Sequence, residues 1–294
     1  MPKIAYKTMT FRPDTLKIIN QADEIINDYS SQGYDLTLRQ LYYQFVARGV
    51  IPNSERSYKR LGSIINDARL AGLIDWLAIE DRTRDVKGNN HWETPVNIIE
   101  ASAIQYQIDK WKGQPCRIEV WVEKDALVGV ISRISREMDV PYLSCRGYVS
   151  QSEMWRASCR LRDYEQSGQD TIILHLGDHD PSGIDMTRDI TDRLALFGSR
   201  VDVRRIALTM EQVEEINPPP NPAKVTDARY ETYQAEYGEE SWELDALEPS
   251  YLEALIRLHV EDILDEMLWD KAVLRESDER QVLHDAAERI KKEI

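Results

Sequence analysis

The sequence has few cysteines and no long apolar run. Cys116, Cys145 and Cys159 are its three cysteines, and the pattern Cys-x-x-Cys does not occur. An odd number of widely spaced cysteines predicts reduced core thiols rather than a disulfide framework or a zinc site. No apolar segment approaches the ~18 residues of a membrane-spanning helix, and the first residues lack a signal-peptide pattern. We therefore expect a cytoplasmic protein with no membrane partner.

The chain also lacks the glycine-rich loops of the common nucleotide-binding motifs. Neither Gly-x-Gly-x-x-Gly nor Gly-x-x-x-x-Gly-Lys follows any predicted strand. We therefore do not expect this chain alone to turn over ATP. Its 294 residues, 42% hydrophobic and 30% charged, are enough for two soluble domains with cores of their own.

Basic residues are outnumbered, and the net charge is -15. This charge argues at first against a nucleic-acid partner, because phosphate binding depends on Lys and Arg. The charge is unevenly distributed, however. Residues 1–91 contain 13 Lys and Arg against 11 Asp and Glu, whereas the remainder contains 24 against 41. A DNA-binding surface is therefore expected in the amino-terminal third.

Residues 1–111 have the pattern of a winged-helix DNA-binding domain. Helices are predicted from Pro13, from about Thr37 and over about 54–73, and the polar stretch 81–90 follows. The third helix would enter a DNA groove, with the polar stretch as the wing. The basic residues expected to contact DNA are Arg56, Lys59, Arg60 and Arg69 on the third helix, and Arg82 and Arg84 near the wing. A helical domain with a charged exposed face explains the same pattern, and a further helix is predicted over 97–111.

Two adjacent tyrosines in the second helix are expected to face different ways. Leu38, Leu41, Tyr42 and Phe45 recur at helical spacing and predict a buried face that includes Tyr42. Tyr43 lies about 100° around the helix and shares a face with Arg39, four residues back. We therefore expect Tyr43 to lie off the core.

Strands and helices alternate in residues 116–216. The predicted strands are 117–123, 141–145, 171–177 and 201–207, and the helices after them are 125–138, 151–165, 184–197 and 210–216. This alternation predicts an α/β fold with a four-stranded parallel sheet and crossover helices.

Residues 217–294 begin with a proline-rich loop and continue as an acidic helical extension. A short helix is expected over 230–237, a longer one from Pro249 that includes Met267, and an exposed helical end at 286–294. The aromatic side chains of this part are interpreted as packing onto the sheet rather than as a base-stacking set. They are Tyr230, Tyr233, Tyr237 and Trp242.

Carboxylates follow two of the predicted strands. Glu123 ends one strand, and Asp178 and Asp180 follow the buried run 172–176 of another. Open α/β sheets place their chemistry at the carboxyl ends of their strands, and alternate residues of an extended segment point the same way. Oxygen ligands suit a hard cation. The sequence therefore predicts a Mg²⁺ site formed by Glu123, Asp178 and Asp180.

Two motifs resemble known families. The runs Val122-Glu-Lys-Asp-Ala126 and Asp178-His-Asp-Pro-x-Gly183, in a four-stranded α/β unit, resemble the Toprim domain of topoisomerases, primases and related nucleases. The run Arg39-Gln-Leu-Tyr-Tyr43 resembles the Arg-acid-aliphatic-Tyr-Tyr motif of the topoisomerase VI A subunit and the meiotic double-strand-break protein. The resemblance covers roughly residues 10–210, and Gln40 stands where that family usually has an acid.

This resemblance implies Mg²⁺-dependent cleavage of DNA strands through a phosphotyrosine, as in the A subunit of a type IIB topoisomerase. The family's nucleophile corresponds to Tyr43, which Arg39 and the metal held at Glu123 would assist. The implied partners are double-stranded DNA, a second copy of the chain whose acids meet Tyr43, and a separate ATPase (B-type) subunit. Two alternatives stay open: a Toprim nuclease that uses metal-activated water, and a non-catalytic DNA-binding component of a larger assembly.

Overall fold

The amino-terminal part of the chain is a group of three helices. In the computed structural model, which describes residues 3–79 and 89–293, they are α1 (Pro13–Ser31), α2 (Leu38–Ala47) and α3 (Glu55–Leu70). Thr37 and Ser54 begin α2 and α3, because each side-chain oxygen accepts a hydrogen bond from a backbone N–H three residues later. Apolar side chains of all three helices share one core.

The winged-helix assignment stays a prediction. Between α3 and α4 (Pro95–Gln105), the described residues form isolated bridges, such as that of Leu36 with Ile79, and no longer strand. Residues 81–88 of the predicted wing, including Arg82 and Arg84, lie outside the described residues.

A four-stranded parallel sheet follows, as predicted. Its strands, in the order β2-β1-β3-β4, are β1 (Cys116–Val122), β2 (Tyr142–Ser144), β3 (Asp170–Leu176) and β4 (Asp202–Ala207). The neighbours β1 and β3 pair along their whole length, and Val122 lies opposite Leu176 at their ends. The residues that follow, Glu123 and Gly177, therefore leave the sheet at the same edge.

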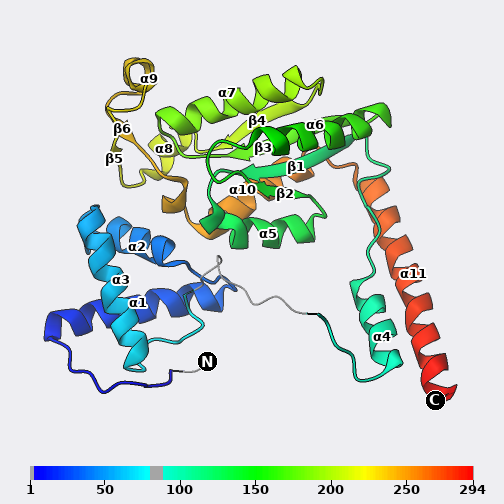
Figure 1. The fold of residues 1–294 in the computed structure, drawn as a ribbon, viewed down its shortest axis with the longest axis horizontal. Coiled ribbons are helices and arrows are strands. Elements are labelled where there is room, and N and C mark those ends of the chain that lie inside the picture. Colours follow the sequence, from blue (N-terminus) through cyan, green and yellow to red (C-terminus); the bar gives the residue numbers. More distant parts are fainter. Residues whose placement is uncertain (1–2, 80–88, 294) are drawn as a thin grey trace.

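Helices cover both faces of this sheet (Figure 1). They are α5 (Val128–Glu137), α6 (Gln151–Gln166), α7 (Pro181–Leu196) and α10 (Pro249–Glu261), and the single turn η1 (Asp125–Leu127) precedes α5. Trp121 and Ile173 pack with α6 and α7 on one face, whereas Val120 and Leu174 pack with α5 and α10 on the other. Successive residues of β1 and β3 are buried, and because successive strand residues point to opposite sides, both faces of the sheet are covered.

The acidic extension returns to the sheet. After α8 (Met210–Ile216) it forms β5 (Asn221–Pro222), α9 (Tyr230–Tyr237), β6 (Glu240–Ser241) and the short turn η2 (Leu244–Ala246). Residues 240–247, here called the link segment, place Trp242 and Leu244 in the same core as the sheet. The rings of Tyr233, Tyr237 and Trp242 contact His179, in agreement with the predicted packing role.

The end of the extension differs from the prediction. The helix expected to run from Pro249 through Met267 ends at Glu261, and α11 (Glu266–Glu293) begins a second helix of 28 residues. The side chain of Asp265 accepts a hydrogen bond from the backbone N–H of Leu268 and so starts the new helix locally. Residues 286–293 of the predicted exposed end form the last part of α11, where Ala287 is buried.

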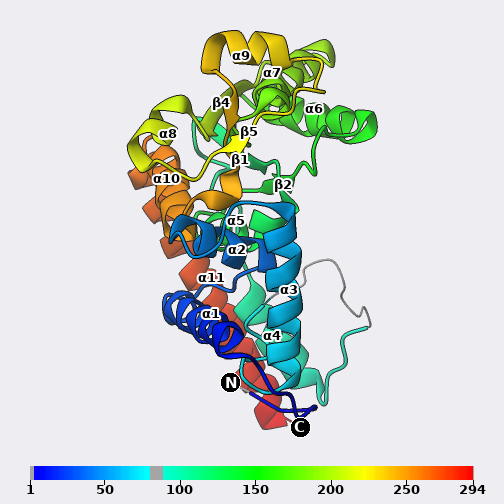
Figure 2. The ribbon, with the colours of Figure 1, turned by 90° about the vertical axis from the view of Figure 1, so that its left-hand side faces the viewer.

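The helices α4 and α11 lie side by side and extend away from the sheet (Figures 1 and 2). The predicted helix over 97–111 begins at Pro95 and ends at Gln105, because the next residues leave the helix to bond with α11. The backbone N–H of Ile108, for example, donates to a carboxylate oxygen of Glu276. None of the described helices is both long and apolar enough to span a membrane. The three cysteines are free thiols, but only Cys145 is buried as the prediction of core thiols requires, whereas Cys116 and Cys159 are half-buried.

Candidate functional site

Glu123 and Asp178 meet at the carboxyl edge of the sheet. The backbone N–H of Asp178 donates to Glu123 Oε2 at 2.8 Å, a contact that the matched ends of β1 and β3 make possible. Burial, followed by the charge of Asp178, raises the pKa of Glu123. Burial also raises the pKa of Asp178, against the opposing effect of Lys124. Burial and mutual repulsion thus disfavour the charged forms of both acids at this edge, a cost that a bound cation would relieve.

Gly183 permits this close approach. A Cβ atom at Gly183 would lie 2.2 Å from the carbonyl oxygen of Asp178 and 3.2 Å from Glu123 Oε2. The first value is far inside van der Waals contact. The glycine of the Asp-x-Asp-Pro-x-Gly run is therefore required for packing, and its backbone needs no left-handed conformation.

Asp180 caps α7. Its Oδ1 accepts hydrogen bonds from the backbone N–H of Gly183 at 2.6 Å and the hydroxyl of Ser182 at 2.9 Å. The helix predicted from Ile184 thus begins at Pro181, whose missing N–H is tolerated at the first helical position. Asp180 Oδ2 accepts no hydrogen bond from the described residues.

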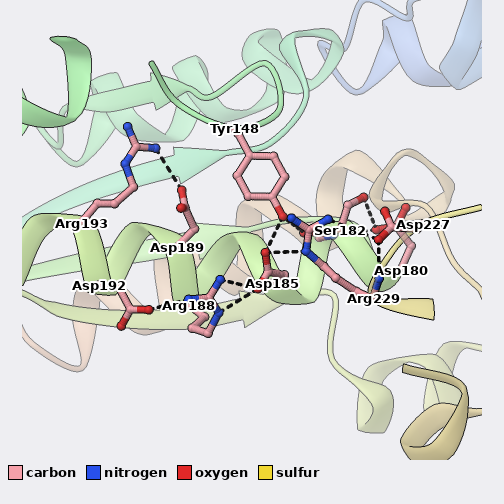
Figure 3. Close-up of polar contacts among 11 residues, drawn as sticks. Tyr148, Asp180, Ser182, Asp185, Arg188, Asp189, Asp192, Arg193, Asp227 and Arg229 are labelled. Carbon is pink, nitrogen blue, oxygen red and sulfur yellow. Dashed lines mark hydrogen bonds and ion pairs between the residues drawn. The ribbon is translucent and has the colours of Figure 1, made fainter. Parts of the chain in front are cut away.

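Beyond Asp180, polar side chains of α7 form a separate ion-pair cluster (Figure 3). Asp185 accepts a hydrogen bond from the Tyr148 hydroxyl at 2.6 Å and pairs with Arg188 and Arg229, each at 2.7 Å. This cluster holds the first part of α7 to the loop before α6 and to the turn before α9.

Arg205 contacts the loop after β3, which carries Asp178 and Asp180. The sequence patterns did not single out this residue. This half-buried β4 residue donates hydrogen bonds to the backbone carbonyls of Gly177, Asp178 and Gly183. The guanidinium group of Arg205 therefore stabilises the negative ends of three carbonyl dipoles and lies near the carboxylates of Glu123, Asp178 and Asp180.

Lys124 connects the acids of the sheet with the link segment. Its Nζ lies 2.8 Å from Asp178 Oδ2, 2.6 Å from Glu243 Oε2 and 3.4 Å from Asp245 Oδ2. Burial lowers the pKa of Lys124, but these three carboxylates together raise it. Its ammonium group is therefore held charged among three carboxylates.

Arg39 reaches the same carboxylates from α2. It forms an ion pair with Glu243, and its Nε lies 3.0 Å from Asp245 Oδ2. Its guanidinium carbon lies 5.9 Å from the ring centroid of Tyr43, which agrees with their predicted shared face. Although burial opposes ionisation, Lys124 and Arg39 hold the pKa of Glu243 at about 2.

The prediction that Tyr43 lies off the core is wrong, because its exposed fraction is only 3%. Helical periodicity assigned this face of α2 to solvent. The link segment, which includes η2 and comes much later in the sequence, covers it. Burial, followed by the charge of Glu243, raises the pKa of Tyr43 well above its ordinary value. The hydroxyl of Tyr43 is therefore protonated in this conformation.

Tyr42 is buried, as predicted, and has a structural contact of its own. Its hydroxyl donates to Asn53 Oδ1 at 2.8 Å and accepts a hydrogen bond from the backbone N–H of Ser54 at 2.7 Å. Tyr42 therefore holds the start of α3, whereas Tyr43 faces the link segment.

A pocket of about 240 Å³ opens beside Tyr43. It lies between the start of α3, α2 and the link segment, and its lining includes Arg39, Tyr43, Asn221 and Glu243. The ion pairs around Glu243 therefore border a space that molecules can enter.

The basic residues predicted to bind DNA along α3 fall into two groups. Arg56 and Arg60 are exposed and form no ion pair within the described part of the chain. Lys59 is exposed but pairs with Glu55 at 2.7 Å. Arg69, expected to point outward, is half-buried because its guanidinium stacks 4.9 Å over the Trp76 ring. Free positive charge on α3 therefore comes from Arg56 and Arg60.

The predicted metal ligands share one edge but do not form a ready-made cage. Across residues 3–79 and 89–293, no three His, Cys, Asp or Glu side chains are placed to hold a metal ion together. Both oxygens of Asp178 are engaged, by Lys124 and by the backbone N–H of Leu244. The Mg²⁺ site thus stays a prediction.

Sequence patterns missed Glu243 and Asp245. Both lie in an acidic region without helical or strand periodicity, and their partners are remote in the sequence.

No protein-family model and no curated protein matches the chain. A function proposed for it therefore rests on its own residues and their geometry.

Proposed function

We propose that this chain cleaves DNA strands in a Mg²⁺-dependent reaction in which Tyr43 attacks the phosphodiester. The new bond joins the tyrosine oxygen to phosphorus, and the bond from phosphorus to the 3′ oxygen breaks. Tyr43 loses its hydroxyl proton, and the departing 3′ oxygen gains one. The products are a 5′-phosphotyrosine and a free 3′-hydroxyl, and the reverse reaction rejoins the strand.

One observation carries this proposal: Arg39 of the tyrosine helix and Lys124 of the acidic edge both pair with Glu243. The nucleophile and the acids are thus neighbours of one charged network within a single chain. Two cations that share a carboxylate, one of which also lies over the Tyr43 ring, suit a reaction that develops negative charge on a phosphate.

Glu123, Asp178 and Asp180 are the residues that would hold Mg²⁺. Glu123 Oε1 and Asp180 Oδ2 accept no hydrogen bond from the described residues, so they are available as ligands. The charges of Asp178 and Asp180 help raise the pKa of Glu123, which marks a repulsion that a cation would relieve. When bound, the ion supplies charge neutralisation on the phosphate.

A second candidate is a Toprim-like nuclease that uses metal-activated water. The burial of Tyr43 and its raised pKa favour this alternative, because a protonated, covered phenol is a poor nucleophile. Tyr43 can attack only after the link segment or the bound DNA changes its surroundings.

The proposed partners are double-stranded DNA, contacted through a winged-helix-like amino-terminal domain, a second copy of the chain, and a separate ATPase (B-type) subunit. Mixing Tyr43→Phe chains with Asp178→Asn chains tests the dimer. Cleavage returns in the mixture if the tyrosine of one chain serves the acids of its partner, and it stays absent if each chain uses its own.

The deciding experiment for the reaction is a covalent trap. The protein is mixed with plasmid and Mg²⁺ and quenched with denaturant, and we expect DNA linked to the chain. Cleaved DNA without linked protein would favour the water mechanism, and intact DNA under all conditions would reject both enzymatic candidates.

A further inference from the structure

The carboxylate of Glu243 lies where an anionic ligand of the two cations would bind. It pairs with Lys124 Nζ at 2.6 Å and with Arg39, and Asn221 Nδ2 donates to its second oxygen at 3.4 Å. It also borders the pocket beside Tyr43. A carboxylate and a phosphate accept the same charge-assisted hydrogen bonds from Arg and Lys.

The charges around Arg39 and Lys124 indicate that the carboxylate of Glu243 is the one that a phosphate can replace. Three carboxylates, those of Asp178, Glu243 and Asp245, surround the two cations. Neither oxygen of Asp245 receives a hydrogen bond of good geometry from the described residues. If the Glu243 side chain left, Asp178 and Asp245 would still hold Lys124, and Asp245 would still hold Arg39.

The side chain of Glu243 can move while its backbone stays in place. Its neighbours Trp242 and Leu244 are buried in the sheet core, so the link segment is anchored on both sides. The Glu243 side chain itself is 24% exposed, whereas that of Asp245 is fully covered. A change of rotamer would therefore turn the carboxylate outward without unfolding the segment.

We propose that Arg39 and Lys124 form a phosphate-binding site that Glu243 occupies in this structure and leaves when a DNA phosphate enters. The carboxylate thus acts as an internal competitor of the substrate. This inference rests on the proposed function, because it takes the phosphodiester beside Tyr43 as the ligand.

Binding without cleavage tests this inference. We expect Glu243→Gln to bind a short DNA duplex about tenfold more tightly than the wild type, measured by fluorescence anisotropy in EDTA at fixed salt. The plot of log affinity against log salt should steepen by ~0.9 if one more phosphate is neutralised. Glu240→Gln is the matched control, since this exposed acid of the same segment forms no ion pair within the described residues.

Two further variants make the test specific. Adding Lys124→Gln to Glu243→Gln should remove the gain in affinity, because the site then has only one of its two cations. If Glu243→Gln lowers the melting temperature and obscures binding, Glu243→Asp serves in its place, because the shorter carboxylate reaches the cations less well and should also tighten binding.

Equal affinities for Glu243→Gln and Glu240→Gln, or a gain that persists without Lys124, would overturn the inference. These measurements contain no Mg²⁺ and no cleavage, so they are independent of the covalent trap. DNA that stays intact in the trapping experiment, together with a tenfold gain in binding, would reject the enzyme and keep the phosphate site.

Discussion

Lys124 Nζ lies 2.8 Å from Asp178 Oδ2, so the cation that follows β1 is paired with the carboxylate that follows β3. The same ammonium group also reaches Glu243 and Asp245 of the link segment. A predicted metal ligand is therefore part of an ion-pair network that extends to Arg39 and Tyr43, and metal binding at Asp178 requires this network to rearrange.

Neutralising a predicted metal ligand should remove Mg²⁺-dependent cleavage. We expect Asp178→Asn and Glu123→Gln to lower the rate more than about 100-fold, because a charge-stabilising metal contributes several kcal/mol to the transition state. Asn and Gln keep the shape of the acids, so circular dichroism should show an intact fold. Asp192→Asn is the control, since Asp192 is an exposed acid on α7 that pairs with Arg188. Wild-type cleavage rates in both site variants would exclude the metal site.

Replacing the two adjacent tyrosines one at a time should distinguish an effect on stability from an effect on formation of the covalent adduct. Tyr42→Phe leaves the backbone N–H of Ser54 without its partner and should cost about 1–2 kcal/mol of unfolding free energy while the covalent adduct persists. Tyr43→Phe should keep stability near that of the wild type and abolish the adduct. Urea titration and the denaturant-quenched trap measure the two effects. An adduct that survives in Tyr43→Phe would contradict the assignment of the nucleophile.

The unpaired cations of α3 should contribute more to the DNA affinity than the paired one. Reversing Arg56 and Arg60 to Glu should weaken duplex binding and flatten the log-log salt dependence by ~0.9 for each phosphate that the protein no longer binds. Lys59→Gln should have a smaller effect, because Lys59 already pairs with Glu55. Affinity measured against salt concentration decides this. An unchanged slope in the double variant would place the DNA elsewhere on the molecule.

A side chain at Gly183 should destabilise the acidic edge. Gly183→Ala would bring its Cβ to 2.2 Å from the carbonyl oxygen of Asp178, and overpacking of this kind costs about 1–3 kcal/mol. Gly113→Ala, where a Cβ meets no atom within 4 Å, should be nearly neutral. Urea denaturation of both variants gives the comparison. Equal unfolding free energies of the two variants would show that the loop after β3 can move to accommodate the added methyl group without loss of stability.

Local sequence patterns were enough to predict most elements of this fold. Apolar runs predicted all four strands of the sheet, and side-chain caps such as Thr37 and Ser54 marked where α2 and α3 begin. The position of Glu123 and Asp178 at one edge followed from strands that end together. These features depend on neighbouring residues, whose spacing is visible in the sequence.

The surroundings of Tyr43 and the acids, in contrast, depend on how distant segments pack. Helical periodicity assigned Tyr43 to solvent, but the covering link segment joins Arg39 to Glu243 across 204 residues and Lys124 to Glu243 across 119. Periodicity reports which face of an element is apolar, and it cannot show that an acidic segment will cover the opposite face. That outcome depends on buried opposite charges whose attraction acts through space, so Glu243 and Asp245 became visible only once the chain was folded.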